Sequence, residues 1–365
     1  MSHFRFFDCA KRALCDAFIP NYTSETSSDN RTINMPRVLI TVSELVFQFG
    51  PCQQILVDGG FEIAYPPKGI TLHDEDRLIQ HLHGIDAALV GSEPLSRRVL
   101  ESSKLRAIAR FGVGYDAVDI AAATERGIAV AITPGANQES VAEHALALIL
   151  GVMRGFPRRD HGVRNGSWGH REPLAPVRGK TLGLIGLGRI GKEVVPRAQA
   201  FGMRVIAYDP QPDCRFADSN KVRLCSLDEL LAESDIVSLH LPCTPKTEQI
   251  INRGTLAKMR RGAILINTAR GGLIDEEALA DALTTGQLAG AGLDAFVVEP
   301  PPTSSRLLQF ENVLLSPHTA GVDLDSARAM ACLAAECLVR LYQGKGLSAG
   351  CLVNPEIEPD WKWED

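Results

Sequence analysis

Short runs of apolar residues alternate with amphipathic segments along most of this chain. Four runs in its first part have the length and composition of buried strands. They are RVLITV (37–42), DAALVG (86–91), LRAIARF (105–111) and IAVAIT (128–133). Between them, residues 74–84 and 119–127 carry apolar positions at helical spacing, and the second segment ends at a glycine. Alternating strands and helices predict βαβ units around a parallel sheet.

A second alternating series follows, and it fits the doubly wound fold that binds dinucleotides. Its predicted strands are TLGLIG (181–186), RVIAYD (204–209), DIVSLHL (235–241), AILINTA (263–269), AGAGLDAF (289–296) and VLLSPH (313–318). A helix over 138–155, apolar nearly all round, joins the two series and should bury at least two faces. Residues 156–179 predict a loop, and a last helix is expected over 325–344. The fold class is therefore α/β, with two doubly wound parallel-sheet domains.

The composition is that of a globular protein with room for two domains. The chain has 365 residues, of which 45% are hydrophobic and 22% charged. A net charge of −6 without a basic cluster argues against a nucleic-acid partner. No apolar run has the length of a membrane span. The nine cysteines contain no C-x-x-C pair, which indicates a reducing compartment, so we expect a cytoplasmic protein.

Both ends of the chain differ from the rest. Residues 1–34 are interpreted as an N-terminal extension: Asp8 and Asp16 argue against a targeting peptide, and Met35 is an alternative start. The acidic tail, 355–365, is expected to fray, with docking of its two tryptophans on a partner as the alternative. His3, His161 and His170 lack the spacing of metal ligands, so no metal is expected.

The stretch GLIGLGRIG (183–191) carries a G-x-G-x-x-G pattern between a predicted strand and a predicted helix. Gly186 permits the tight turn, Gly188 lets the backbone approach a pyrophosphate, and Gly191 lets the helix pack on the strand. The helix N-terminus then faces the phosphates, with Arg189 and Ile190 in its first turn and the charge of Arg189 beside them. The pattern therefore predicts a dinucleotide site.

Asp209 ends the next predicted strand, where an acid can bond the adenosine ribose. The same negative charge repels a 2′-phosphate, which predicts NAD rather than NADP as the cofactor. The alternative is a strand, turn and helix that bind no ligand. Strand, glycine spacing, helix and acid together favour the cofactor site.

Three further stretches bring in groups suited to redox chemistry. They are NTARGGLID (267–275), DAFVVEPPP (294–302) and LLSPHTAG (314–321). Together with RFGVGYDAVD, PGANQESVAEHALAL, GKTLGLIGLGRIG and HLPCTPKTEQII, all between Pro36 and Asn354, they make the chain resemble the D-2-hydroxyacid dehydrogenase family. The resemblance implies a flavodoxin-like substrate domain, 35–133 plus 319–354, and an inserted Rossmann NAD-binding domain, 134–318. It also implies an active site in the cleft between them.

The resemblance implies a catalytic trio of Arg270, Glu299 and His318. The forked guanidinium of Arg270 suits the carboxylate and carbonyl of a 2-oxo acid. Hydride from NADH attacks the carbonyl carbon, and His318 would supply the proton that the new alkoxide needs. Glu299 would orient the imidazole and favour its protonated form. Singly, each residue has a structural alternative, namely a surface ion pair, a solvated loop acid and a helix cap; together, at the carboxyl ends of strands, they favour catalysis.

Other site residues follow from the resemblance alone. The backbone N–H groups of Val113 and Gly114 would hold the substrate carboxylate, and Ser92 would also bind the substrate. The cofactor would contact Val141, His240, Pro242, Thr247, Thr268, Ala269, Asp294 and His318. Within this set, Asp294 would bond the nicotinamide carboxamide. His144 is expected to be a packed interface residue of the long helix rather than a ligand.

The substrate stays open among phosphoglycerate, glycerate or hydroxypyruvate, and related small 2-hydroxy or 2-oxo acids. Many phosphoglycerate dehydrogenases carry an arginine just before the serine of the second substrate-domain strand, where this chain has Gly91. That difference argues against a phosphorylated substrate, although Arg110 is a candidate substitute. Glu299 argues against formate dehydrogenase, whose histidine pairs with glutamine.

Two expectations concern partners and class. A transcriptional corepressor built on this fold binds NAD(H) and keeps the same catalytic trio, so it remains the alternative to an enzyme. The resemblance and the apolar helix 138–155 together predict a homodimer.

Overall fold

The computed structural model describes residues 35–42, 51–67, 69–70, 72–169, 171–357 and 361–363. The predicted extension 1–34, with His3, lies outside the described residues, and so does His170. The chain divides into two compact units, Met1–Met35 and Pro36–Asp365, and all elements named below belong to the second. Among the described residues, no helix has the length and apolar character needed to cross a membrane.

Five parallel strands form the first sheet, in the order β2-β1-β3-β4-β5. They are β1 (Arg37–Ile40), β2 (Glu62–Ala64), β3 (Ala87–Val90), β4 (Ala107–Arg110) and β5 (Ala129–Ala131). The helices of this part are α2 (Cys52–Asp58), α3 (Glu75–His81), α4 (Arg97–Glu101) and α5 (Ile120–Glu125). The four predicted strands are confirmed. The sequence does not predict β2, because this edge strand is exposed or half-buried and has no apolar run.

Seven parallel strands form the second sheet, in the order β12-β11-β10-β9-β6-β7-β8. They are β6 (Thr181–Ile185), β7 (Arg204–Tyr208), β8 (Arg223–Leu224), β9 (Ile236–Leu239), β10 (Ala263–Asn267), β11 (Leu288–Leu293) and β12 (Val313–Leu315). Their helices are α8 (Arg189–Ala200), α9 (Cys214–Ser219), α10 (Leu227–Glu233), α11 (Arg253–Lys258) and α12 (Glu276–Thr284). Every residue of β6, β9 and β10 is buried, as expected for a sheet covered on both faces. The six predicted strands are confirmed, and the two-residue edge strand β8 is additional.

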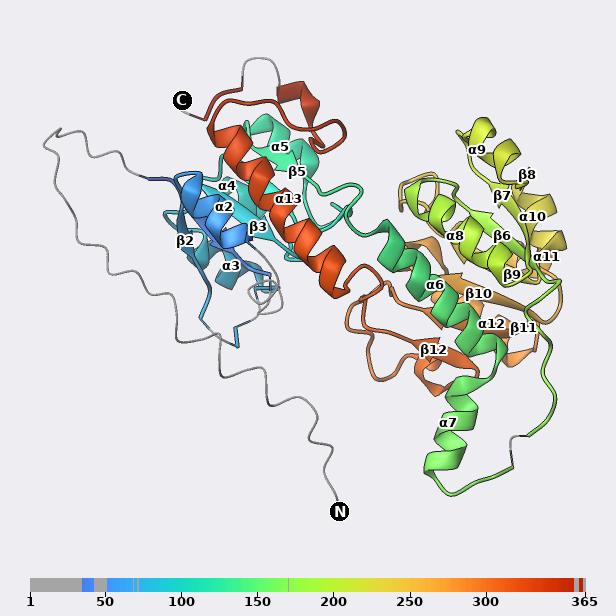
Figure 1. Ribbon diagram of the computed structural model, residues 1–365. Helices are drawn as coiled ribbons and strands as arrows, with labels where there is room; N and C mark the ends of the chain where they lie inside the picture. The colour runs from blue at the N-terminus through green and yellow to red at the C-terminus, as the bar shows by residue number, and fades with distance from the viewer. Residues whose placement is uncertain are drawn as a thin grey trace, which may run out of the picture. The chain divides into compact units, whose positions relative to one another are not determined.

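The long helix between the two sheets is shorter than predicted, and a second helix follows it (Figure 1). α6 (Gln138–Met153) packs against α8 and β11. Gly155 then adopts a left-handed conformation with φ +62°, and α7 (Phe156–Arg164) begins. The predicted loop over 156–179 is therefore wrong in its first part. Pro157 does not prevent the helix, because it lies in the first turn, where no intrahelical N–H bond is lost.

The last helix, α13 (Leu324–Tyr342), packs against α2 and β4 of the first sheet (Figure 1). Asn354 then fixes the following segment to the edge strand β5. Its Oδ1 accepts a hydrogen bond from Val130 N–H and its Nδ2 donates to the carbonyl of Ile128, both at 2.9 Å. Chain segments far apart in the sequence thus share the core of the first sheet.

The acidic tail packs on the same sheet instead of fraying. Trp361 Nε1 donates to the carbonyl of Gly127 at 2.7 Å. The ring of Trp363 packs edge-on against Phe61 and Tyr342, with centroid distances of 5.6 and 5.2 Å. The expectation of a frayed tail, or of tryptophans that dock on a partner, is wrong for these residues because their own chain supplies the aromatic surface. Residues 358–360 and 364–365 of the predicted tail lie outside the described residues.

Replacing Trp363 by alanine tests this docking. The loss of two ring contacts and of partly buried area should lower the free energy of unfolding by about 2 to 3 kcal/mol, measured by urea denaturation. Leu324→Ala is the control, because Leu324 is 63% exposed, and it should have an effect below about 0.5 kcal/mol. Equal small effects of both substitutions would show that the tail is undocked in solution.

Candidate active site

The glycine turn lies between β6 and the N-terminus of α8, where the sequence predicts it. Gly186 has φ +103°, and a Cβ there would overlap the carbonyl of His240. A Cβ on Gly191 would overlap the carbonyl oxygen of Gly186. By contrast, a Cβ on Gly188 would meet no described atom within 4 Å. The outer two glycines therefore serve the fold, while the space beside Gly188 is open to a ligand.

Asp209 directly follows β7, and its carboxylate lies against the glycine turn. Its Oδ2 accepts a hydrogen bond from Leu187 N–H and its Oδ1 accepts one from Gln211 N–H, both at 2.8 Å. Each oxygen keeps a further lone pair, which suits a ribose hydroxyl. The carboxylate therefore both anchors the turn and places negative charge beside it.

Two buried polar atoms at the carboxyl edge of the second sheet also fit a bound dinucleotide. Thr268 Oγ1, after β10, has no hydrogen-bond partner among the described residues, and neither has His240 Nδ1. The other nitrogen of His240 lies 2.8 Å from Ser238 Oγ. Burial lowers the pKa of His240 to about 4, so its imidazole is neutral. The imidazole of His240 and the hydroxyl of Thr268 are therefore uncharged polar groups that can hydrogen-bond a ligand, and burying them costs less than burying a charge.

The other predicted cofactor residues are placed by local contacts. Thr247 Oγ1 donates to the carbonyl of Pro242 at 2.7 Å and so closes the loop after β9. Val141 is buried in α6. Ala269 N–H donates to Asn267 Oδ1 at 3.0 Å. These contacts show how the residues are held in the fold.

His318 and Glu299 form a hydrogen-bonded pair. His318 Nδ1 lies 2.7 Å from Glu299 Oε2, and Glu299 Oε1 accepts from Phe296 N–H at 2.9 Å. Burial raises the pKa of the Glu299 carboxyl. The bonds from His318 and Phe296 and the charge of Arg270 outweigh that effect and hold it below its usual value. Because Nδ1 faces the carboxylate, Nε2 is the ring nitrogen left for a reacting molecule.

Arg270 follows β10 and reaches across to the turn after β4. Its Nε donates to Asp116 Oδ2 at 2.6 Å and its Nη1 donates to the carbonyl of Ala269 at 2.7 Å. A Cβ on Gly114 would overlap Arg270 Nη2, so the guanidinium lies against that backbone. The charge of Arg270 also lowers the pKa of Glu299. The three predicted catalytic residues therefore lie within electrostatic range of one another.

The turn below this guanidinium offers two backbone donors. Gly112 has φ +125°, and its N–H donates to Thr133 Oγ1 at 3.0 Å. The carbonyl of Gly114 accepts from Arg110 Nε at 2.9 Å. Within the described ranges, the N–H groups of Val113 and Gly114 donate to no acceptor. Two unengaged N–H groups beside an arginine can bind a carboxylate.

Asp294 organises the turn that carries His318. It follows β11 and is 1% exposed. Its Oδ1 accepts from Ser316 Oγ at 2.6 Å and from Thr319 N–H at 2.9 Å, and its Oδ2 accepts from Ala320 N–H at 2.9 Å. Its carbonyl accepts from His318 N–H at 2.9 Å, and His318 has a left-handed φ of +53°. Such a conformation is uncommon for a residue other than glycine and is concentrated at functional sites.

Three residues of this site were not predicted as such from the sequence. Asp116 bonds Arg270 and lies in the GVGYD stretch. Its position in that motif is the sequence feature that could have indicated a role in the site. Ser316 lies two positions before His318, and its Oγ donates a hydrogen bond to Asp294. His144 is the third residue, with its Nε2 2.8 Å from Ser316 Oγ. The sequence predicts only a packing role for His144, because helical spacing does not reveal a hydrogen bond to a distant loop. The predicted Ser92 is exposed, with its Oγ 3.0 Å from His73 Nε2.

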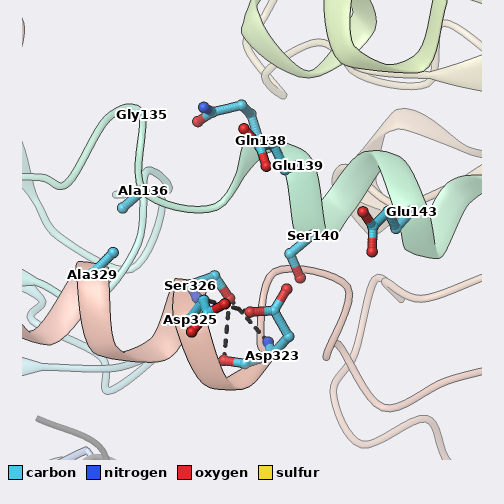
Figure 2. A pocket seen from close by; sticks show the side chains of 10 residues that line it. All are labelled: Gly135, Ala136, Gln138, Glu139, Ser140, Glu143, Asp323, Asp325, Ser326 and Ala329. Atoms are coloured by element: carbon cyan, nitrogen blue, oxygen red, sulfur yellow. Dashed lines mark hydrogen bonds between the residues drawn. The ribbon is translucent and has the colours of Figure 1, made fainter. Parts of the chain in front are cut away.

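A separate pocket of about 340 Å³ lies between the start of α6 and the start of α13 (Figure 2). Its lining includes the carboxylates of Glu139, Glu143, Asp323 and Asp325 and no residue of the predicted site. Four acids disfavour an anionic ligand there. Among the described residues, no group of three His, Cys, Asp or Glu side chains is arranged to hold a metal ion.

Comparison with known proteins agrees with this geometry. The family model described as the NAD binding domain of D-isomer specific 2-hydroxyacid dehydrogenases matches residues 146–320. A D-3-phosphoglycerate dehydrogenase of Archaeoglobus fulgidus is 41% identical over 288 residues, which cover 78% of this chain and 54% of the relative. This chain thus spans about half the length of that relative. A hydroxypyruvate reductase of Thermotoga maritima is 41% identical over 280 residues, covering 75% of this chain and 89% of the relative.

A solved structure has the same fold. The D-lactate dehydrogenase of Aquifex aeolicus, in complex with NAD and lactic acid, superposes with a TM-score of 0.76 at 29% identity. The alignment covers 88% of this chain and 99% of that one. The matching family model is that of an NAD-binding domain, and the glycine turn and the unpartnered polar atoms lie within the matched residues. NAD is therefore the cofactor of this chain.

Two substitutions separate the roles of Asp209. Asp209→Asn and Asp209→Ala both remove the negative charge, so the preference for NADH over NADPH should fall by about tenfold or more. Only alanine removes both side-chain acceptors, including the one bonded to Leu187 N–H, so it should also weaken NADH binding. Fluorescence titration gives both dissociation constants, and Asp218→Asn is the control because Asp218 is an exposed acid. Equal binding of NADH and NADPH by the unmutated protein would overturn this role.

Proposed function

Because the chain belongs to the D-isomer specific 2-hydroxyacid dehydrogenase family, we propose that it is an NAD-dependent 2-hydroxyacid dehydrogenase. The reaction is reversible hydride transfer between NAD(H) and a small 2-hydroxy or 2-oxo acid. The observation that carries the proposal is the His318–Glu299 pair, at 2.7 Å, together with Arg270 placed against the Gly114 backbone. This combination provides a proton donor and an anion site for one small molecule.

The cofactor supplies the hydride when it is bound at the glycine turn. Gly186, Gly188 and Gly191 shape the pyrophosphate site, Arg189 and Ile190 open its helix, and Asp209 binds the ribose. Val141, Thr268, Ala269 and Asp294 would hold the nicotinamide end, and His240, Pro242 and Thr247 would hold the adenosine side. The open space at Gly188 and the unpartnered Thr268 Oγ1 support the assignments of these two residues.

The chain's own groups hold the acid and move the proton. Arg270 Nη2 and the N–H groups of Val113 and Gly114 bind the carboxylate, and Arg270 polarises the neighbouring carbonyl. His318 Nε2 gives its proton to the carbonyl oxygen as the alcohol forms, and takes it back in the opposite direction. Glu299 positions the imidazole through Nδ1. Asp116 positions Arg270 from the substrate side.

A panel of 2-oxo acids with NADH tests the proposal. The unmutated protein should oxidise NADH with at least one acid, and His318→Ala should lower kcat by about 100-fold to 10,000-fold while NADH binding is kept. His83→Ala, which changes an exposed histidine, is the control. Tight NADH binding without turnover of any acid would instead favour the regulatory protein that uses NAD(H) as a ligand.

The domain boundaries and the location are part of the proposal. Residues 35–133 with 319–354 form the substrate domain and residues 134–318 the NAD-binding domain, which is supported by the packing of α13 on α2 and β4. The expected location is the cytoplasm. The free thiols of the described cysteines, such as Cys52 and Cys351, support a reducing compartment.

We also propose a homodimer formed through helix 138–155 and the adjoining α7. Phe156, Val163 and Trp168 are 59%, 55% and 74% exposed and succeed one another directly after α6. Several large exposed apolar side chains in one segment are typical of an interface.

Sedimentation at micromolar concentration measures this association. The unmutated protein should sediment as a dimer, and the double substitution Phe156→Asp with Trp168→Asp should give monomers. Phe201→Asp, at a residue 47% exposed on α8's end, should leave the dimer intact. A monomeric unmutated protein would remove the proposal.

A further inference from the structure

Two charged side chains are buried at the carboxyl edge of the first sheet. Arg110 is the last residue of β4 and is 8% exposed. Glu93 lies in the loop after the neighbouring strand β3 and is 6% exposed. Val90 and Arg110 are register partners, so the two strands end side by side. Ligands of parallel α/β sheets bind at this edge.

Each side chain keeps one buried polar atom without a partner. Arg110 Nη1 donates to nothing and Glu93 Oε2 accepts from nothing within the described part of the chain. Burial lowers the pKa of Arg110 to about 10, although the negative charge of Glu93 partly opposes that shift. Since charged groups are rarely buried without partners, a donor and an acceptor left unengaged in one place indicate a missing polar group.

The pair borders the site of the proposed reaction. Arg110 Nε donates to the carbonyl of Gly114 at 2.9 Å, and Arg270 Nη2 lies against the same glycine. The positive charge of Arg270 also acts on Arg110 and disfavours its charged form. A Cβ on Gly91 would lie 3.4 Å from Glu93 Oε2, so the carboxylate occupies the space over that glycine.

We propose that Glu93 and Arg110 recognise a hydroxyl group on carbon 3 of the substrate, an inference that rests on the proposed dehydrogenase function. One hydroxyl satisfies both atoms, because it donates to Glu93 Oε2 and accepts from Arg110 Nη1. A methyl group at that position leaves both atoms unpaired. A phosphate group has only acceptors at neutral pH to offer the pair and is repelled by the Glu93 carboxylate. The acid is therefore a 3-hydroxy-2-oxo acid and its reduced form.

Steady-state kinetics with NADH and three acids of equal chain length tests the proposal. The acids are hydroxypyruvate, pyruvate and 3-phosphohydroxypyruvate. The unmutated protein should have a kcat/KM for hydroxypyruvate at least about tenfold above that for each of the others, as expected when a buried hydrogen bond to a charged group is lost.

Glu93→Gln then isolates the negative charge, because the amide keeps the size of the side chain and an acceptor oxygen. The kcat/KM for 3-phosphohydroxypyruvate should rise by about tenfold or more, and the preference for hydroxypyruvate over it should fall. A gain of activity on one acid does not arise from poor folding. Glu101→Gln is the matched control, because Glu101 is an exposed acid of the helix α4, and it should leave all three kcat/KM values unchanged.

Arg110→Met tests the donor. It should lower kcat/KM for hydroxypyruvate by about tenfold or more while pyruvate changes less, because pyruvate makes no bond to Nη1. A uniform loss on both acids would show that Arg110 only supports the Gly114 turn.

The failures of the two proposals are distinguishable. If no 2-oxo acid is reduced, the dehydrogenase function itself is wrong and the hydroxyl site falls with it. The inference is overturned if acids are reduced, the kcat/KM values for pyruvate and hydroxypyruvate are equal, and Glu93→Gln leaves the ratio of these two values unchanged. A bound water then satisfies the Glu93–Arg110 pair. A preference of the unmutated protein for 3-phosphohydroxypyruvate overturns it as well.

Discussion

The geometry of the site depends on the hydrogen bonds that the buried carboxylate of Asp294 accepts. It accepts hydrogen bonds from Ser316, Thr319 and Ala320, and its own backbone carbonyl fixes the N–H of His318. These bonds hold His318 in a left-handed conformation that its side chain alone disfavours. Without that carboxylate, several donors of the turn would lose their acceptor, and the imidazole would lose its position relative to Glu299.

The direction of the strands explains why residues distant in sequence meet. Arg110, Gly186, Asp209, Arg270 and Asp294 each stand at or shortly after the carboxyl end of a parallel strand. All strands of one sheet point the same way, so Gly186, Asp209, Arg270 and Asp294 share one edge of the second sheet, while Arg110 lies at the corresponding edge of the first. The contact of Arg270 with Asp116 then joins the edge of the second sheet to the turn after β4 of the first. A site for a small acid between two sheets needs only such short loops.

Buried parallel strands and motif-bearing loops were predictable because their signals are local. Strands covered on both faces give continuous apolar runs, and the glycine turn needs particular residues at fixed spacing. The edge strands β2 and β8 have no such run. The α7 segment is predicted to be a loop because it contains proline and glycine. The docking of Trp363 on Phe61 could not be read from the chain, because it depends on aromatic surfaces brought together only by folding.

The same distinction separates the reaction from the choice of acid. In the proposed reaction, Arg270 and His318 act on the carboxylate and carbonyl that every 2-oxo acid shares, so their roles do not depend on which acid is bound. In the proposed complex, Glu93 and Arg110 lie beside the Gly114 turn and recognise the part of the substrate that differs among acids. Relatives of this chain carry the names phosphoglycerate dehydrogenase, glyoxylate reductase and hydroxypyruvate reductase, which refer to different acids. The buried carboxylate of Glu93 can therefore select among substrates without any change in the catalytic groups. Its negative charge disfavours an anionic substituent, and its oxygen accepts a hydrogen bond from a neutral hydroxyl.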